Sequence, residues 1–312
     1  MNYGMFLAFK VLIIGSLLVV GSLLVFNNAL NVGQFVAMEI VVILSLTAVD
    51  KLILTTETMY DILTALEKLG SLTDLPLESE RGEHLGNEPG TQGMGIAIKD
   101  LTLRFPDMRH PVISHATMTV KAGERVNLIT TDDSFITHFF RLLTGFYDGY
   151  KGSITINGLP LQNLCIEDLR LHVGGYSTLQ EIFDGSLLEN ITMGIEGVNL
   201  DRVLPIIKAV GLADFVEGEQ DGLHAHLQTH GGTLPESIKR KIILARSLAT
   251  HPSLLLLNQP FDGLDAIDKN GFLAYVREHL PTTTMIIATP DPLPQGLADR
   301  AFRIENHTVI AA

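Results

Sequence analysis

The sequence predicts an α/β domain in which strands alternate with helices, preceded by an α-helical transmembrane hairpin. Three observations support this. Two apolar runs lie near the N-terminus, and no charged residue stands between Lys10 and Glu39. A segment rich in Pro, Gly and charge follows them. From Gly95 onward, short β-type runs alternate with helical patterns, which is typical of a layered domain with a largely parallel sheet.

Composition restricts the classes of function. The chain has 312 residues, a length typical of about two domains. Its hydrophobic share of 46% favours a membrane-embedded segment. Its 22 Lys and Arg against 35 Asp and Glu give a net charge of −13, which opposes contacts with a phosphate backbone, so we expect no nucleic-acid partner. The single cysteine, Cys165, excludes an intramolecular disulfide.

The first apolar run, Met5–Phe26, is long enough to cross a bilayer as a helix if Lys10 extends its amine to one interface. The alternative is a secretory signal peptide. It is disfavoured because no small-residue cleavage pattern follows the run and a second hydrophobic stretch does.

The second run, Phe35–Leu54, follows a short polar turn at Asn27–Gly33. It carries Glu39, so we expect it to face protein or a cavity rather than lipid. Apolar residues keep helical spacing through Thr55–Leu69, which predicts that the helix continues into water until Gly70 ends it.

These patterns divide the chain into a helical hairpin over 1–70, a linker over 71–94 and an α/β domain over 95–312. The linker is assigned because it has too little apolar content to pack. Strands are predicted at Ile96–Phe105, Ala116–Val120, Val126–Thr130, Ser153–Ile156, Leu254–Leu257, Met285–Thr289 and, as a terminal pair, Ala301–Val309. Helices are predicted at Ser134–Leu143, Leu200–Val210, Glu236–Ala249 and near Asp268–Leu280.

The order of several short motifs in the α/β domain resembles one family. These motifs are Phe105-Pro106-Asp107, Gly123–Val126, Arg141–Asp148, Gly152–Gly158, Phe183–Ile191, Leu244–Leu248, Pro252–Pro260 and Leu264-Asp265. Residues 95–312 resemble the nucleotide-binding domain of an ATP-binding cassette (ABC) transporter, a P-loop NTPase-like fold. Residues 1–70 resemble the last two membrane helices of an exporter-type half-transporter, particularly of type I secretion and peptide exporters.

The resemblance places a phosphate-binding loop between the strand Val126–Thr130 and the helix that follows. Such a loop needs glycines to wrap phosphate, a Lys for the β and γ oxygens and a hydroxyl for Mg²⁺. Here Ile136 stands at the lysine position, Asp132 and Asp133 oppose a polyphosphate, and Thr137 keeps the hydroxyl. An ordinary strand–turn–helix with Asp and Ser capping the helix explains the loop better. The degenerate nucleotide-binding positions are Phe105, Thr130, Asp133, Ser134, Ile136, Thr137, His138 and Gln180.

The hydrolytic positions that the resemblance implies also lack their usual chemistry. Asn258 and Gln259 stand where the family has a magnesium-binding Asp and a Glu that polarises water, and amides neither carry that charge nor accept a proton at pH 7. Pro290 stands at the switch histidine, so no catalytic residue is assigned.

Two further motif positions depart from the family pattern, and an aromatic position is kept. The signature loop corresponds to Leu234–Ile238, in which Pro235 lacks an N–H. Thr178 stands at the expected glutamine, with Gln180 as its substitute if the loop is shifted. Phe105 is a candidate to stack on adenine, and the alternative is a core aromatic.

The spacing of His224, His226 and His230 suggests a metal site. A solvated loop without a metal is favoured instead, because the stretch is Gly-rich and has no nearby Cys. No metal site is therefore predicted, and we expect no cofactor, with ATP and Mg²⁺ bound only if binding survives the altered loop.

Polar site residues are replaced at several separate places while the apolar runs remain foldable. This pattern favours a truncated or split ABC exporter subunit with a degenerate, non-hydrolysing ATP-binding domain and a structural or regulatory role. The alternatives are a fragment of a complete transporter that couples ATP hydrolysis to export and, least favoured, an ATPase with an unconventional site. We expect a multi-pass protein of the inner membrane with a cytoplasmic nucleotide-binding domain, dimerised with another half-transporter or split membrane subunit.

Overall fold

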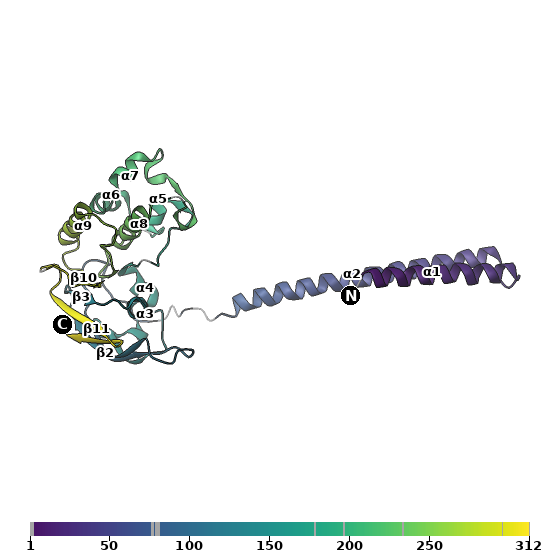
Figure 1. Ribbon diagram of the computed structural model, residues 1–312, viewed down its shortest axis with the longest axis horizontal. Coiled ribbons are helices and arrows are strands. Elements are labelled where there is room, and N and C mark those ends of the chain that lie inside the picture. The colour runs from purple at the N-terminus through teal and green to yellow at the C-terminus, as the bar shows by residue number, and fades with distance from the viewer. Residues whose placement is uncertain are drawn as a thin grey trace. The chain divides into compact units, whose positions relative to one another are not determined.

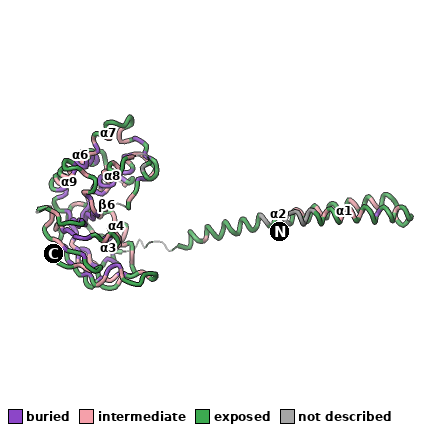
Figure 2. The backbone as a smooth tube through the Cα atoms, in the orientation of Figure 1, coloured by how far each residue is buried: buried purple, intermediate pink, exposed green. Residues whose placement is uncertain are grey.

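A computed structural model of the chain describes residues 3–75, 78, 82–177, 179–195, 197–232, 234–294 and 296–311. The chain divides into two compact units, Met1–Glu78 and Ser79–Ala312. We call them the helical unit and the α/β unit and describe each by itself. Figure 2 shows that buried residues concentrate in the α/β unit, whereas those of the helical unit are mostly exposed.

The helical unit is a hairpin of two long helices, α1 (Tyr3–Phe26) and α2 (Val32–Thr73) (Figure 1). Asn31 begins α2 with a capping box, because its side chain accepts the Gln34 N–H at 2.8 Å while Gln34 Oε1 accepts the Asn31 N–H at 3.1 Å. The predicted hairpin is confirmed.

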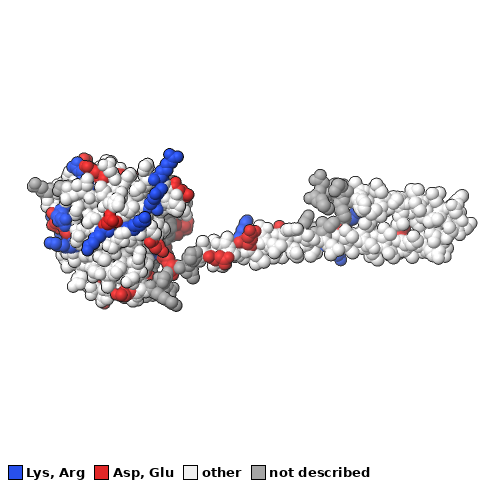
Figure 3. Space-filling view, turned by 90° about the horizontal axis from the view of Figure 1, so that it is seen from below, with Lys and Arg blue, Asp and Glu red and all other residues white. Residues whose placement is uncertain are grey.

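Both helices include a stretch long and apolar enough to cross a membrane, Ala8–Phe26 and Val32–Leu52. On the face drawn in Figure 3, the surface of these two apolar stretches carries few charged side chains. The Lys10 amine pairs with the Asp50 carboxylate, so one ion pair joins the two helices.

The second helix runs past Gly70 and ends at Thr73, beyond the predicted end. One glycine in an exposed helix costs only about 1 kcal/mol, and the next turn remains hydrogen-bonded. The Asp74 N–H donates to the Gly70 carbonyl at 2.8 Å, and the Ser71 hydroxyl donates to the Lys68 carbonyl at 2.7 Å.

Over its described residues, the α/β unit contains strands β1 to β12, α-helices α3 to α9 and three short 3₁₀ turns. The strands are β1 (Ile96–Leu103), β2 (Ile113–Val120), β3 (Arg125–Ile129), β4 (Lys151–Ile156), β5 (Leu159–Pro160), β6 (Val173–Tyr176), β7 (Gly185–Ser186), β8 (His226–Leu227), β9 (Leu254–Asn258), β10 (Thr284–Thr289), β11 (Arg300–Glu305) and β12 (Thr308–Ala311). The helices are α3 (Asp133–Leu143), α4 (Ile166–Leu171), α5 (Leu187–Thr192), α6 (Leu200–Ala209), α7 (Ala213–Gly218), α8 (Glu236–Ala249) and α9 (Ala266–His279). The 3₁₀ turns are Leu161–Asn163, Gly222–His224 and Thr229–Gly231.

Two main sheets organise this unit. The larger has the order β12-β11-β3-β10-β9-β6, with β11, β3, β10, β9 and β6 parallel and β12 antiparallel at one edge. The smaller is antiparallel, in the order β2-β1-β4-β5. The predicted layered α/β fold with a largely parallel core is therefore confirmed.

The core lies in two clusters. One packs α3, through side chains such as Phe135 and Phe139, between the smaller sheet and part of the larger one. The other packs α5, α6, α8 and α9 against β9 and β10. Strands β9 and β10 are buried at every position, which explains their continuous apolar sequence.

Residues 82–94, which we call the strap, differ from the predicted linker because they pack on the α/β unit. Glu83 forms a β-bridge with Leu164, and Met94 is buried. The strap contributes few apolar side chains, so most of its attachment is through hydrogen bonds, which a hydropathy pattern does not reveal.

Candidate functional site

The loop between β3 and α3 is a compact, internally bonded turn. The Thr130 N–H donates to the Thr289 carbonyl at 2.9 Å, and Thr130 Oγ1 accepts the Asp132 N–H at 2.9 Å. Asp132 caps α3 by accepting the Phe135 N–H at 2.9 Å. The predicted Asp cap is confirmed, and Ser134 lies exposed in the first helical turn.

Both loop carboxylates already have partners. Asp132 Oδ2 lies 3.1 Å from Nδ1 of His307, which stands in the turn between β11 and β12. Asp133 Oδ1 accepts a hydrogen bond from Gln259 Nε2 at 3.0 Å. The negative charge at the N-terminus of α3 therefore comes from the chain's own side chains, a position where a helix favours an anion.

Gln259 follows the buried strand β9 and adopts a left-handed backbone with φ 51°. Its N–H donates to the Ala288 carbonyl at 2.9 Å, which ties the end of β9 to β10. This conformation directs Gln259 to α3, while the preceding residue, Asn258, is buried at the strand end. The two amides are adjacent in sequence but lie in different surroundings.

A cavity of about 220 Å³ lies beside α3 and brings together four predicted positions, Ile136, Thr137, Gln180 and Asn258. Two polar atoms in its lining, the Tyr176 hydroxyl and Gln180 Oε1, are buried and have no hydrogen-bond partner among the described residues. Burial raises the pKa of the Tyr176 phenol, so this group is neutral at physiological pH. The cavity also contains one cation, Arg141.

Ile136 also lines this cavity but belongs to the core. Its side chain is 1% exposed and packs in the same cluster as Phe135 and Phe139. An aliphatic side chain there offers no hydrogen-bond donor, so its contribution is apolar packing.

Phe105 and His138 contact each other. Their ring centroids are 4.9 Å apart, Phe105 also lies 5.3 Å from the Tyr147 ring, and His138 Nδ1 lies 3.0 Å from the Tyr147 hydroxyl. Burial and, secondarily, Arg141 lower the pKa of His138. Phe105 is half-buried against the core, in agreement with the core-aromatic alternative.

Sequence reasoning missed the contribution of Asn127, a buried amide in the middle of β3. Its Nδ2 donates to the Ile287 carbonyl at 3.0 Å and to Thr289 Oγ1 at 2.8 Å, and its Oδ1 accepts the Leu293 N–H at 3.1 Å. A polar residue inside an otherwise apolar strand was the available signal. Asn127 fixes the segment after β10, where Pro290 is exposed.

The remaining predicted positions are separate from this cavity. Pro235 precedes α8, and the Glu236 carboxylate lies 3.5 Å from Arg240 Nε. His226 lies 3.4 Å from Asp184, and His230 pairs with Glu181. Among the residues that the structure describes, no group of three or more His, Cys, Asp or Glu is placed to hold a metal ion. Thr178 lies outside the described residues.

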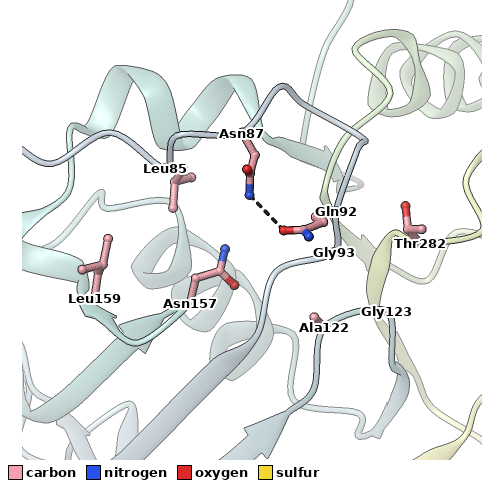
Figure 4. Close-up of a pocket in the computed structure, with 9 residues that line it drawn as sticks. All are labelled: Leu85, Asn87, Gln92, Gly93, Ala122, Gly123, Asn157, Leu159 and Thr282. Carbon is pink, nitrogen blue, oxygen red and sulfur yellow. Dashed lines mark hydrogen bonds between the residues drawn. The ribbon is translucent and has the colours of Figure 1, made fainter.

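A larger cavity, of about 690 Å³, lies under the strap (Figure 4). The described residues that line it carry no charged side chain; they are Leu85, Asn87, Gln92, Gly93, Ala122, Gly123, Asn157, Leu159 and Thr282. In Figure 4 Asn87 donates to Gln92, at 3.0 Å. Within the described part of the chain, this lining offers amide, hydroxyl and apolar groups and no charged partner for a polyphosphate or its metal.

Comparison with known proteins identifies the fold. Residues 113–262 match the family model described as ABC transporter. The solved structure of a bacterial Atm1-family ABC exporter with ATP bound superposes with a TM-score of 0.74 at 20% identity, covering 96% of this chain and 52% of that one. The α/β unit has the fold of an ABC transporter ATP-binding domain. We call it the ABC domain.

Curated relatives point to the same class. An ATP-dependent lipid A-core flippase of Francisella novicida is 28% identical over 205 residues, which is 65% of this chain and 34% of the relative. The corresponding flippase of Chromobacterium violaceum is 24% identical over 258 residues, which is 83% of this chain and 42% of the relative. The chain therefore spans about a third to two fifths of these relatives. The narrower resemblance to type I secretion and peptide exporters stays a prediction.

The residues of the ABC domain fit Mg-ATP poorly. Thr137 retains a hydroxyl in the cavity, but the residue before it is apolar Ile136, and the loop that leads into α3 carries the two carboxylates of Asp132 and Asp133. Carboxylates repel phosphate oxygens, and Asn258 supplies no negative charge to a magnesium ion. The donor set therefore does not match the ligand.

Proposed function

We propose that the chain is a structural or regulatory subunit of a transmembrane export complex, whose ABC domain does not hydrolyse ATP. The observation that carries this proposal is the contact between Gln259 and Asp133. A glutamate at position 259 would face the Asp133 carboxylate directly, whereas the amide donates to it. The residue that removes the catalytic base thus also stabilises the loop that replaces the phosphate site.

The loop itself supports the proposal. The α3 N-terminus holds two carboxylates, one in contact with His307 and one with Gln259. A tetra-anionic ligand would have to displace both contacts and would gain no lysine in return, because Ile136 is packed in the core. Losing a charge-assisted hydrogen bond typically costs about 1.5–3 kcal/mol.

The helix N-terminus that would complete a partner's site is altered as well. Pro235 offers no N–H, and Glu236 occupies the first turn of α8 beside Lys239 and Arg240, at 3.9 and 3.5 Å. Because the family's nucleotide sites are shared between two domains, a homodimer of this chain would lack a competent site. The expected assembly is therefore with another half-transporter or split membrane subunit that binds the nucleotide.

The helical unit supports a membrane location. It has two candidate spans, Ala8–Phe26 and Val32–Leu52. In their most apolar windows, 6% and 0% of the residues are buried inside the unit, so bilayer lipid or other helices would cover these spans. In the proposed topology both ends of the chain are on the cytoplasmic side of the inner membrane, with only Asn27–Gly33 outside.

Phosphate release and ligand-induced stabilisation test the proposal on the full chain in detergent. We expect no phosphate release above a protein-free blank and little thermal shift with millimolar Mg-ATP. The Gln259→Glu variant should remain inactive. A shift of several degrees that requires Mg²⁺, or turnover that disappears on mutation of Thr137, would overturn the proposal.

A second candidate is a fragment of a complete transporter that couples ATP hydrolysis to export. The short coverage of the relatives favours it, together with the convergence of Thr137, Gln180 and Asn258 on one cavity. The coding DNA upstream distinguishes the two. An in-frame continuation before Met1 indicates a longer protein, whereas a separate frame encoding further membrane helices indicates a split subunit.

A further inference from the structure

The strap is attached to the ABC domain by hydrogen bonds from widely separated elements. The Leu85 N–H donates to Asp168 Oδ2 at 2.7 Å, and the Gly90 N–H donates to Ser253 Oγ at 3.0 Å. Thr282 Oγ1 donates to the Gly90 carbonyl at 3.2 Å. Gly90 has φ 78° and lies so close to the His251 carbonyl that a side chain would collide with it. The strap therefore occupies one defined position on the ABC domain, and we call the strap seated when these hydrogen bonds are formed.

His172 stands between this strap and α4. Its side chain is buried, at 3% relative exposure, and the residue ends α4. Nδ1 lies 2.8 Å from the Asp168 carbonyl oxygen, and Nε2 lies 2.7 Å from the Asn87 carbonyl oxygen in the strap. The His172 carbonyl accepts the N–H groups of Ser253 and Leu254 at 2.8 and 3.0 Å, which fixes the residue at the start of β9.

This geometry has a chemical consequence for the imidazole. A carbonyl oxygen only accepts hydrogen bonds, and a neutral imidazole has one N–H, so either tautomer leaves a nitrogen lone pair facing an oxygen lone pair. An imidazolium donates from both nitrogens. The Asp168 carboxylate, with Oδ1 4.0 Å from Nδ1, supplies the compensating charge that a buried cation needs.

We propose that His172 is an imidazolium while the strap is seated, and that loss of this proton releases the strap. The hydrogen bond to Asn87 is the contact that breaks, because the Asp168 carbonyl belongs to the same helix and stays in place. The seated form is therefore favoured at acidic pH and weakened as the pH rises. Release would loosen residues 82–94 and open one wall of the cavity in Figure 4.

The titratable groups next to His172 lie on α4 and in the strap. Asp168 lies on α4, and its Oδ2 is 3.7 Å from Nδ1 of His84 in the strap. Glu83 and His251 approach this region through their backbones, Glu83 in its bridge to Leu164 and His251 through its carbonyl beside Gly90, while the His251 imidazole contacts the Tyr275 hydroxyl. His84 is mostly exposed and shares the Asp168 carboxylate with His172. Its contribution to the stability of the seated strap must therefore be measured separately from that of His172.

Hydrogen–deuterium exchange of the full chain in detergent tests the proposal, with rates corrected for intrinsic pH dependence. The reporters are the strap amides of Glu83, Leu85 and Gly90, each of which donates a hydrogen bond in the seated form. In the wild type we expect their protection to be about tenfold lower at basic than at acidic pH, the size of one charge-assisted hydrogen bond. In His172→Gln we expect low protection that no longer varies with pH.

His84→Gln is the matched control and should retain the pH dependence. Asp168→Asn keeps an oxygen for the Leu85 N–H but removes the compensating charge, so strap release should begin at lower pH. This variant tests the proposal even if His172→Gln does not fold. Strap protection that is independent of pH in the wild type, a dependence that survives in His172→Gln, or one that vanishes in His84→Gln would overturn it.

Discussion

The side-chain amide of Gln259 donates a hydrogen bond to the carboxylate of Asp133, with 3.0 Å between Nε2 and Oδ1. The two residues are 126 positions apart, at the end of β9 and the beginning of α3. The contact joins the end of β9, where the motif resemblance predicts the hydrolytic positions, to the loop where it predicts the phosphate site. The amide and the carboxylate therefore form one complementary pair.

Exchanging the donor in this pair should destabilise the ABC domain. In Gln259→Glu two carboxylates face each other, and we expect a loss of about 1 kcal/mol because the pair is partly exposed to solvent. Adding Asp133→Asn restores an amide–carboxylate pair with the roles reversed and should recover most of the loss. Thermal unfolding of the full chain in detergent measures both effects. Equal stability of the wild type and Gln259→Glu would show that the contact contributes nothing.

Ile136 should behave as a core residue. Ile136→Ala removes buried methyl and methylene groups, and such truncations lower the free energy of unfolding by about 2–5 kcal/mol. Ile267→Ala is the control, since Ile267 is 81% exposed and an exposed truncation changes stability by about 0.5 kcal/mol or less. The same unfolding experiment measures both variants, and similar effects in the two would contradict a packing role for Ile136.

His251 should make the ABC domain less stable in mild acid. Burial, followed by Arg202 and His279, lowers the pKa of His251 below its ordinary value of 6.5, and Nε2 lies 3.0 Å from the Tyr275 hydroxyl. Below pH 6.5 the unfolded chain binds a proton that the folded chain does not, so stability falls with decreasing pH.

The His251→Asn variant should flatten this dependence, since Asn tolerates the left-handed backbone found at position 251, φ 52°. Thermal unfolding between pH 5 and 7.5 provides the measurement. His110→Asn, at an exposed loop position, should leave the pH profile unchanged. A profile that is identical in the wild type and His251→Asn would refute the assignment.

The ion pair between Lys10 and Asp50 should support the helical hairpin in the membrane. Lys10→Asp opposes two carboxylates in a low-dielectric region, and we expect a smaller fraction of the protein in the membrane pellet after alkaline carbonate extraction. Adding Asp50→Lys restores opposite charges and should restore the pellet fraction. Release of the wild type into the supernatant would contradict the membrane assignment itself.

Local patterns predicted most of the ABC fold. The bounds of α8, Glu236–Ala249, agree at both ends because Pro235 and helical periodicity mark them. The buried strands β9 and β10 were equally evident from their apolar runs. In contrast, β6 was missed, since Val173–Tyr176 is four residues long and contains two glycines.

The candidate site was only half predictable. Aligning the motifs identified Thr137, Gln180 and Asn258, which the fold brings to one cavity. Nothing in the sequence indicated that His307 contacts Asp132, because this pair depends on the register of the C-terminal hairpin against β3. The strap was misjudged for a related reason: its partners are backbone carbonyls and single polar side chains, which leave no periodic pattern.

The position of β3 in the larger sheet has a consequence for synthesis of the protein. Its two neighbours, β10 and β11, occupy residues 284–305, so both of its edges stay unpaired until the ribosome has made more than 150 residues beyond it. Throughout that time the apolar strand is a nascent segment in need of protection from aggregation. The larger sheet is therefore completed around β3 only late in synthesis, after residues 284–305 have been made.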